Sequence, residues 1–167
     1  PSDRLTIHTP YLGGGFGRRI ELDVMREAIE IAKVTPDTPV MTLWSREEDM
    51  RHGVFRPAAM ARMEATLHPS TGLPERLRMH AAGPSVSAQF MKRLMGRGGG
   101  ADTDKTNVDG LVGLPYALPD LEVKHTVVDA GVPVGFWRSV GHCQNAFFAE
   151  CFVDACAAAA RQDPLTY

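Results

Sequence analysis

The segment at residues 144–161 constrains the fold most strongly, because apolar side chains occupy nearly every side of the helix that it would form. Its composition, rich in alanine and phenylalanine, predicts one long helix. A helix without a polar face has to be covered on several sides. We therefore expect this helix to lie in the core, or against a domain that is absent from this sequence.

The remaining segments predict a mixture of strands and further helices. Apolar residues recur at helical spacing over residues 21–33. Because no regular βαβ repetition is present, the expected fold class is α+β, with mixed sheets packed against a few helices. The expected strands are residues 5–8, residues 39–45, a hairpin of residues 59–67 and 75–82, and residues 121–129.

We expect residues 1–167 to form a single unit within a larger domain. The chain has no initiating methionine and starts inside a strand-like run, which indicates a piece of a longer polypeptide. The expected regions are the glycine loop and helix at residues 5–35, the hairpin region at 39–83, a long loop at 84–114 with one short helix near 88–95, and the strand, turn and C-terminal helix at 120–161.

Composition excludes two classes of partner. The formal net charge is −2 and the isoelectric point is near 6.3, whereas nucleic-acid-binding domains usually carry a strong basic excess. No apolar run reaches the roughly 18 residues that indicate a membrane helix. We therefore expect no nucleic acid partner and no membrane span in this chain.

The sequence YLGGGFGRR at residues 11–19 gathers four glycines and two arginines. Such a cluster lets an anionic or bulky ligand approach the backbone closely, and the helix that follows adds its positive N-terminal end. The spacing does not match GxxxxGK[ST], and it fails GxGxxG at the third glycine, so a nucleotide fingerprint is not supported. A glycine-rich turn that binds nothing is the alternative.

Two further sequence blocks follow this loop in the chain and help to interpret it. LWSREEDM at residues 43–50 and VPVGFWRSVGHCQNAFFAE at residues 132–150 follow GGGFGRR in that order. Together the three blocks resemble the molybdopterin-binding large subunit of the xanthine dehydrogenase and aldehyde oxidase family, in its isoquinoline 1-oxidoreductase beta-subunit branch. The resemblance covers nearly the whole chain but only the first part of a much longer family polypeptide. By itself, the run SREEDM indicates a solvated turn capped by Ser45.

The resemblance implies a binding site for molybdopterin, in its simple form or as the cytosine dinucleotide. Such a cofactor needs close backbone donors, which a Cβ atom would obstruct. The family's protein provides no direct ligand to molybdenum, so no metal-ligating residue is expected. The implied cofactor-binding residues are Gly14, Gly15, Phe16, Gly17, Trp137, Arg138, Ser139 and Gln144. Without the resemblance, Trp137 would be interpreted as core packing and Arg138 as a solvated charge.

The resemblance also implies a reaction, in which water-derived oxygen is added to a carbon beside a ring nitrogen or to an aldehyde carbon. Where purine-oxidising relatives have a substrate-binding glutamate, this chain has Ile20, and Glu21 is one place off. Asn107 aligns with their substrate arginine, and Val140 replaces a phenylalanine. A site without such polar partners favours apolar rings. We therefore expect an isoquinoline-like N-heteroaromatic substrate or an aldehyde.

The catalytic glutamate of the family lies downstream in a Gly-Glu context that no glutamate of this chain matches. No catalytic residue is therefore expected here, and the isolated chain is expected to be inactive. The implied protein partners are a small iron–sulfur subunit with [2Fe-2S] clusters and the remainder of the same large subunit. The three cysteines of this chain lack the spacing of cluster ligands. Cytoplasmic and periplasmic relatives exist, so localisation stays open.

A protein of a different class fits the same residues. It is a non-catalytic α+β interaction module with a purely structural glycine loop and an apolar C-terminal helix that docks a partner. The two hypotheses differ in the positions that they require of Phe16 and Trp137. A cofactor site brings both residues to one concave cavity, whereas an interaction module has no such requirement.

Overall fold

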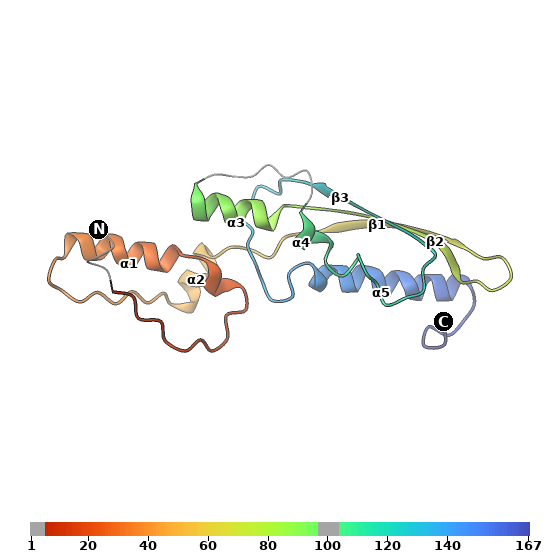
Figure 1. Ribbon diagram of the computed structural model, residues 1–167, viewed down its shortest axis with the longest axis horizontal. Coiled ribbons are helices and arrows are strands. Elements are labelled where there is room, and N and C mark those ends of the chain that lie inside the picture. The colour runs from red at the N-terminus through yellow and green to blue at the C-terminus, as the bar shows by residue number, and fades with distance from the viewer. Residues whose placement is uncertain (1–5, 97–103) are drawn as a thin grey trace.

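The computed structural model describes residues 6–96 and 104–167 and has the α+β fold that the sequence predicts. Five α-helices, one 3-10 helix and three strands lie within these residues (Figure 1). In chain order they are η2 (Arg18–Ile20), α1 (Asp23–Val34), α2 (Arg46–His52), β1 (Met60–Leu67), β2 (Pro74–Gly83), α3 (Val86–Met95), α4 (Lys105–Val108), β3 (Asp120–Val127) and α5 (His142–Ala159).

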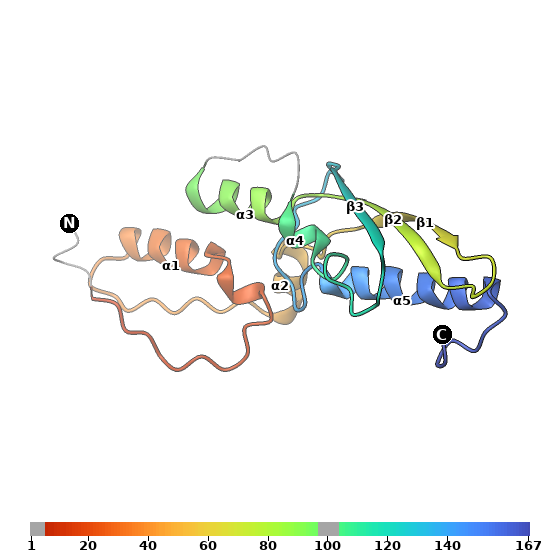
Figure 2. The same cartoon turned by 45° about the vertical axis from the view of Figure 1, so that its right-hand side comes forward.

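The three strands form one mixed sheet in the order β1-β2-β3. β1 and β2 are the predicted hairpin and pair antiparallel, with Met63 opposite Met79. β3 pairs parallel with β2, with Val123 opposite Met79. Parallel neighbours need a long crossover connection, and the chain between β2 and β3, which includes α3 and α4, provides it (Figure 2).

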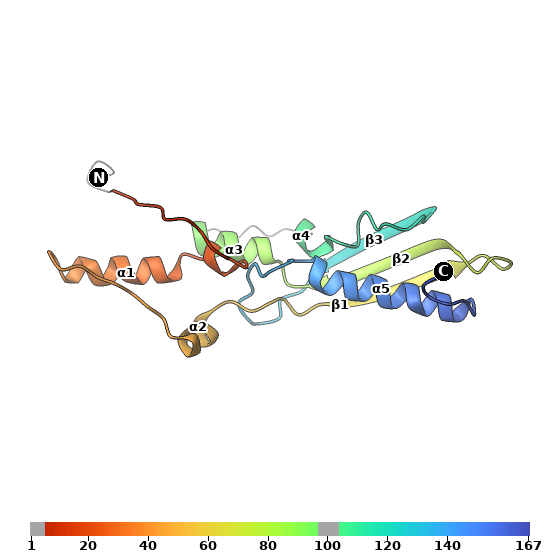
Figure 3. The same ribbon diagram turned by 90° about the horizontal axis from the view of Figure 1, so that it is seen from below.

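The core lies between one face of the sheet and α5, which runs along that face (Figures 1 and 3). Leu77, Met79 and Ala81 alternate along β2 and are buried together with Ala149 of α5. Another side of α5 is open, since Phe147 is 65% exposed. Within the described residues, α5 is therefore covered on one face rather than all round.

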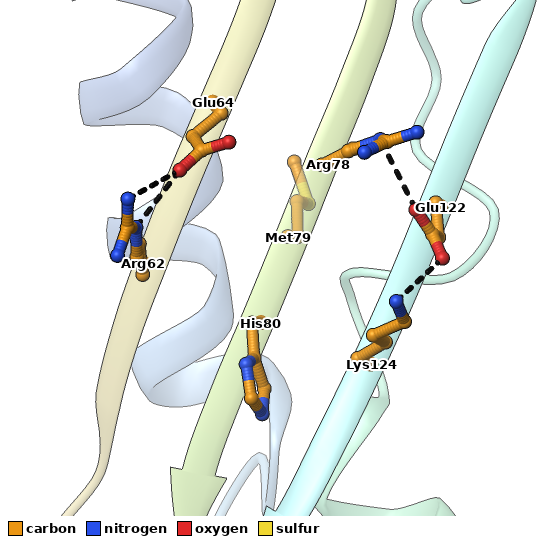
Figure 4. A pocket seen from close by; sticks show the side chains of 7 residues that line it. All are labelled: Arg62, Glu64, Arg78, Met79, His80, Glu122 and Lys124. Carbon is orange, nitrogen blue, oxygen red and sulfur yellow. Dashed lines mark hydrogen bonds and ion pairs between the residues drawn. The ribbon is translucent and has the colours of Figure 1, made fainter.

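The other face of the sheet carries paired charges (Figure 4). Glu122 lies 3.2 Å from Arg78 of the neighbouring strand and 2.8 Å from Lys124 of its own strand. Arg62 pairs with Glu64 at 2.7 Å. A groove of about 260 Å³ runs between these side chains. Because the charged side chains that line this groove are already paired with one another, we do not place the functional site there.

Two predicted strands are wrong. Residues 6–8 and 39–45 belong to no strand, and Leu5 lies outside the described residues. A strand needs a neighbour that satisfies its backbone groups, and in the described parts of the chain the sheet contains only β1, β2 and β3. Met41 and Leu43 are 78% and 79% exposed, so the second run leaves apolar surface uncovered.

The other predicted elements are confirmed with small shifts of their bounds. Ser45 caps α2 as expected, because its Oγ accepts a hydrogen bond from Glu48 N at 3.2 Å. α3 is the short helix predicted in the long loop, and α4 is an additional helix. Residues 97–103 of that loop lie outside the described residues. Among the helices described, none has the length and apolar character needed to cross a membrane.

Asp104 fixes the start of two helices. Its carboxylate is buried and accepts hydrogen bonds from Ser85 Oγ at 2.7 Å and Ser87 N at 2.9 Å. It also accepts from the amide and the hydroxyl of Thr106 at 3.0 and 2.7 Å. Ser85 caps α3, and Asp104 itself caps α4. Burial raises the pKa of Asp104, but these hydrogen bonds outweigh burial and hold the pKa below its ordinary value.

We predict that Asp104→Ala lowers the free energy of unfolding by about 2–4 kcal/mol, because both helix starts lose their acceptor. The pKa of Asp104 is lower in the folded chain than in the unfolded chain. Its contribution is therefore complete above the unfolded pKa and is lost as pH falls through the folded pKa. Urea denaturation at neutral and acidic pH measures both effects.

Asp129→Ala is the matched control for this prediction. Asp129 is exposed and accepts a hydrogen bond from Gly131 N at 2.9 Å within a turn. We expect this control to change the free energy of unfolding by less than about 1 kcal/mol. Equal losses in the two variants would contradict the role assigned to Asp104.

Candidate functional site

A cavity of about 720 Å³ lies where the N-terminal segment, α2 and the turn before α5 meet. Residues 13–17 are called the glycine loop, and residues 136–140 the tryptophan turn. The volume falls within the usual range for cofactor and small-molecule pockets. The glycine loop lines the cavity with Gly14, Gly15 and Phe16, and the tryptophan turn lines it with Phe136 and Trp137.

The backbone of Gly17 packs directly against the tryptophan turn. Its φ is +90°, a conformation that residues with a Cβ atom rarely adopt. A Cβ atom at this position would collide with the carbonyl oxygen of Phe136 and lie 2.8 Å from the Cα atom of Trp137. Glycine at residue 17 therefore allows the two loops to meet.

Gly14 and Gly15 present backbone atoms to the cavity, because glycine has no side chain. A Cβ atom on Gly14 would lie 2.7 Å from Cζ of Phe16, so the ring of Phe16 packs over this residue. A Cβ atom on Gly15 would have its nearest neighbour, Cβ of Arg19, at 3.8 Å. The backbone of Gly15 thus lines the cavity and is not in close contact with other protein atoms.

Arg18 ties the glycine loop to α1 and α2. Its Nη1 and Nη2 donate to the two carboxylate oxygens of Asp23 at 2.9 and 2.8 Å, and its Nε donates to Asp49 at 2.7 Å. Burial raises the pKa of Asp23, but hydrogen bonds from Arg18 and from the Val24 amide outweigh burial and lower it. Arg18 is thereby engaged by protein carboxylates and holds one wall of the cavity.

Arg19 and Arg46 bring further positive charge to the cavity, which both of them line. Arg19 is exposed, and Arg46 approaches Asp49 at 3.5 Å with 76% of its side chain exposed. Guanidinium groups beside aromatic walls suit a planar ligand that carries negatively charged oxygen atoms. In the described parts of the chain, no group of three or more His, Cys, Asp or Glu side chains is placed to hold a metal ion.

The segment after α2 holds the tryptophan turn. The backbone of Phe55 exchanges two hydrogen bonds, of 2.8 and 3.1 Å, with residues 133–135. Nη2 of Arg56 donates to the carbonyl of Arg138 at 2.8 Å, and its guanidinium lies 5.8 Å from the ring centroid of Trp137. Through these two contacts, Arg56 holds the Trp137 ring and the tryptophan turn in position.

The structure brings most of the predicted cofactor-binding residues to one place. Four of them line the cavity, namely Gly14, Gly15, Phe16 and Trp137, and Gly17 makes the contact between the two loops. Arg138 and Ser139 continue the tryptophan turn with exposed side chains and are not among the cavity-lining residues. Gln144 lies apart, where it lines a different, much smaller cavity beside the sheet. The binding role of these residues stays a prediction.

The interpretation of SREEDM as a solvated turn was incomplete. Arg46, Asp49 and Met50 of α2 all line the cavity. Charge and capping alone gave no sign of this position, because both are typical of exposed helix starts. The signal that could have shown it is the block LWSREEDM, which is one of the three blocks that carry the family resemblance.

Two positions compared with purine-binding residues make structural contacts instead. Glu21, with 6% of its side chain exposed, accepts hydrogen bonds from Arg93 of α3 at 2.9 and 2.6 Å. Asn107 is buried, and its Nδ2 lies 2.8 Å from the carbonyl of Pro84 and 3.2 Å from His125. Neither residue is among those that line the cavity.

Together, the fold and the cavity define an α+β unit whose cavity combines glycine backbone, aromatic side chains and guanidinium groups. In an alignment of 169 positions that covers 99% of the chain, the chain is 32% identical to isoquinoline 1-oxidoreductase subunit beta of Brevundimonas diminuta. It is 25% identical over 175 residues to a protein of Gluconacetobacter polyoxogenes named membrane-bound aldehyde dehydrogenase (pyrroloquinoline-quinone). No protein-family model matches the chain.

These matches confirm the resemblance found in the sequence. Nearly the whole of this chain is similar to a part of isoquinoline 1-oxidoreductase subunit beta, and both named relatives are oxidoreductases. The chain spans 21% and 22% of the length of these two relatives. The first name also marks that relative as one subunit of a larger enzyme.

We predict that Gly17→Ala separates the glycine loop from the tryptophan turn, because the added Cβ atom overlaps the carbonyl of Phe136. The positive φ alone adds strain of roughly 1–3 kcal/mol. Gly131→Ala is the matched control, since its φ is +70° but its Cβ atom would meet nothing within 4 Å. The measurements are urea unfolding and the fluorescence of Trp137 in a Trp44→Phe background.

We expect a larger loss of stability in Gly17→Ala than in the control, and a shift of the Trp137 emission only in Gly17→Ala. The Gly131 variant should lose only the contribution of its positive φ. Equal losses with an unchanged emission would show that this contact does not hold the two loops together.

Proposed function

We propose that this chain forms the glycine-loop part of the cofactor site of a molybdenum-dependent oxidoreductase. The observation that carries the proposal is the convergence of Gly14, Gly15 and Trp137 on one cavity of about 720 Å³. The relationship to isoquinoline 1-oxidoreductase subunit beta supports it. An interaction module with a structural glycine loop gives no reason for Phe16 and Trp137 to line the same cavity.

The residues around the cavity fit molybdopterin. The pyrimidine part of its pterin is flat, and Phe16 and Trp137 offer apolar walls for such a ring. Its phosphate is anionic, and the glycine-loop backbone, Arg19 and Arg46 are groups that attract anionic oxygen atoms. When bound, the cofactor would supply the two-electron oxidation chemistry. This chain's residues would bind the cofactor, orient it and shield it from water.

A second candidate cofactor is pyrroloquinoline quinone, because the name of the Gluconacetobacter relative includes it. This cofactor is a planar tricarboxylate, so aromatic walls and arginine side chains suit it as well. The two cofactors differ in one property that can be measured directly, because the molybdopterin cofactor contains molybdenum and pyrroloquinoline quinone does not. Elemental analysis of the purified protein therefore separates the two candidates.

We propose that the whole enzyme oxidises an N-heteroaromatic ring of the isoquinoline type or an aldehyde, with oxygen derived from water. The names of the two relatives include these two substrate classes. Glu21 and Asn107 are engaged by other protein groups, which agrees with a site that does not select a polar purine. The proposed electron-accepting partner is a small subunit with [2Fe-2S] clusters.

We propose that the remainder of the same subunit covers the N-terminal end of this chain. None of the residues of α1 is buried, and Met25 and Ile29 are 58% and 49% exposed. Met41 and Leu43 add exposed apolar surface in the segment that follows α1. Large apolar side chains exposed in this number over residues 25–43 favour contact with further protein.

The test of the proposed site is Gly15→Val in the complete subunit that contains this chain. We predict that cofactor content falls roughly tenfold, which corresponds to about 1.4 kcal/mol, because the new side chain fills space at cavity-lining backbone. Molybdenum is measured by elemental analysis, and pterin and quinone by chromatography, each per mole of purified protein.

Gly13→Val is the matched control, since a Cβ atom on Gly13 would meet nothing within 4 Å and Gly13 is not among the lining residues. We expect this variant to keep the cofactor content of the wild type. If Gly15→Val also keeps it, the glycine loop is not a cofactor wall. A wild-type protein that holds quinone without molybdenum would reassign the cofactor.

We also predict that the isolated 167-residue chain does not oxidise isoquinoline. None of its glutamates stands in the Gly-Glu context of the family's general base, and Glu21 is held by Arg93. The measurement is turnover with an artificial electron acceptor after incubation with cofactor, with the complete subunit as the positive control. Measurable oxidation by the isolated chain would contradict this prediction.

A further inference from the structure

A second cavity, separate from the candidate cofactor site, lies between β2, β3 and the first turn of α5. The space that it offers to the centre of a water molecule is about 10 Å³, which is enough for roughly one water. Its lining includes His125 of β3, Asn107 of α4, and Gln144 and Asn145 of α5. The cavity therefore lies where β2, β3, α4 and α5 meet.

Three side-chain atoms of this lining are buried and have no hydrogen-bond partner within residues 6–96 and 104–167. They are Nδ1 of His125, Oε1 of Gln144 and Oδ1 of Asn145. Asn145 is only 1% exposed. A buried polar atom without a partner costs about 1–3 kcal/mol. Three such atoms around one small cavity therefore indicate a shared polar ligand.

The contacts of Asn107 determine which atom of His125 carries the proton. Nδ2 of Asn107 donates to the carbonyl of Pro84 at 2.8 Å, and this contact sets the orientation of the amide. The same nitrogen lies 3.2 Å from Nε2 of His125, so Nε2 acts as the acceptor. A neutral imidazole then carries its proton on Nδ1. The unpaired ring atom is therefore a donor.

The two unpaired amide oxygens are acceptors. Nδ2 of Asn145 donates to the carbonyls of Asn107 and Asp109 at 2.7 and 2.9 Å. These two contacts set the orientation of the Asn145 amide and assign its other atom as oxygen. With Oε1 of Gln144, the cavity lining thus offers one donor and two acceptors.

We propose that one buried water molecule binds in this cavity, donates to Oε1 of Gln144 and Oδ1 of Asn145, and accepts from Nδ1 of His125. A water molecule has two protons and two lone pairs, so it matches one donor and two acceptors. Three hydrogen bonds is also the usual number for a buried water. The water links β3 to the first turn of α5. It also gives Gln144, for which the family resemblance implies a cofactor contact, a partner inside the fold.

The surroundings of His125 support its neutral form. Burial lowers the pKa of the His125 imidazole most strongly, the Asp104 carboxylate opposes this effect, and His80 adds to it. The net pKa lies below the ordinary value. His125 is therefore neutral at neutral pH, as the hydrogen bond from Asn107 to Nε2 requires.

The first test is nitrogen-15 NMR of the histidine rings in the full chain, combined with water-to-protein cross-relaxation. We expect His125 to be protonated at Nδ1, with a slowly exchanging ring proton and a cross-peak to a long-lived water. His80 is the internal control, because it is exposed on the outer face of the sheet and contacts Thr126 Oγ1 at 2.7 Å. A proton on Nε2 of His125, or a protected Nδ1–H without a water cross-peak, would overturn the proposal.

The second test is Gln144→Met, which keeps the size of the side chain and removes one acceptor. We expect the water cross-peak of His125 to weaken roughly threefold or more, because the water loses one of three partners. The proton should stay on Nδ1, since the contact with Asn107 is retained. Gln162→Met is the matched control, because Gln162 is exposed and donates to Thr71 O. An undiminished cross-peak in a folded Gln144→Met variant would overturn the proposal.

Discussion

One close approach of two backbones governs the arrangement of this chain. Gly17, near the N-terminus, lies against the carbonyl group of Phe136, which directly precedes Trp137 in the turn before α5, and a Cβ atom would not fit between them. The neighbouring Arg18 binds the carboxylates of α1 and α2 and so fixes both helices around the same point. The cavity is the space that these contacts leave between the glycine loop, α2 and the tryptophan turn. The proposed function therefore depends on a contact that a single glycine makes possible.

Local periodicity was sufficient to predict the hairpin, β3, α1 and α5, because alternation and helical spacing report which face of an element is buried. It failed for residues 6–8 and 39–45, since strand composition does not specify the neighbour that a strand needs. The parallel pairing of β2 and β3 could also not be predicted from local periodicity, because it depends on the crossover through α3 and α4. Phe147 of α5 is exposed, so the all-round apolar pattern does not correspond to all-round burial within the described residues.

The candidate site was predictable where it depended on backbone chemistry and family blocks. The glycine cluster and the tryptophan block gave Gly14 and Trp137, which line one cavity. The sequence did not reveal the contribution of α2, because a capped, charged turn looks the same whether it faces water or a cavity. Gln144 lies seven residues after Trp137, but the first turn of α5 directs it to the small cavity beside His125 instead. Sequence distance along a block therefore did not predict which side of the fold each residue faces.

The most direct measurement is an experimental structure of the complete polypeptide that contains this chain, with its cofactor bound. We predict that the cofactor contacts the backbone of Gly14 and Gly15 and the ring of Trp137 within the cavity of about 720 Å³. The contact between Gly17 and Phe136 should be preserved. A cofactor bound elsewhere, with the glycine loop in contact only with protein, would contradict the proposed site.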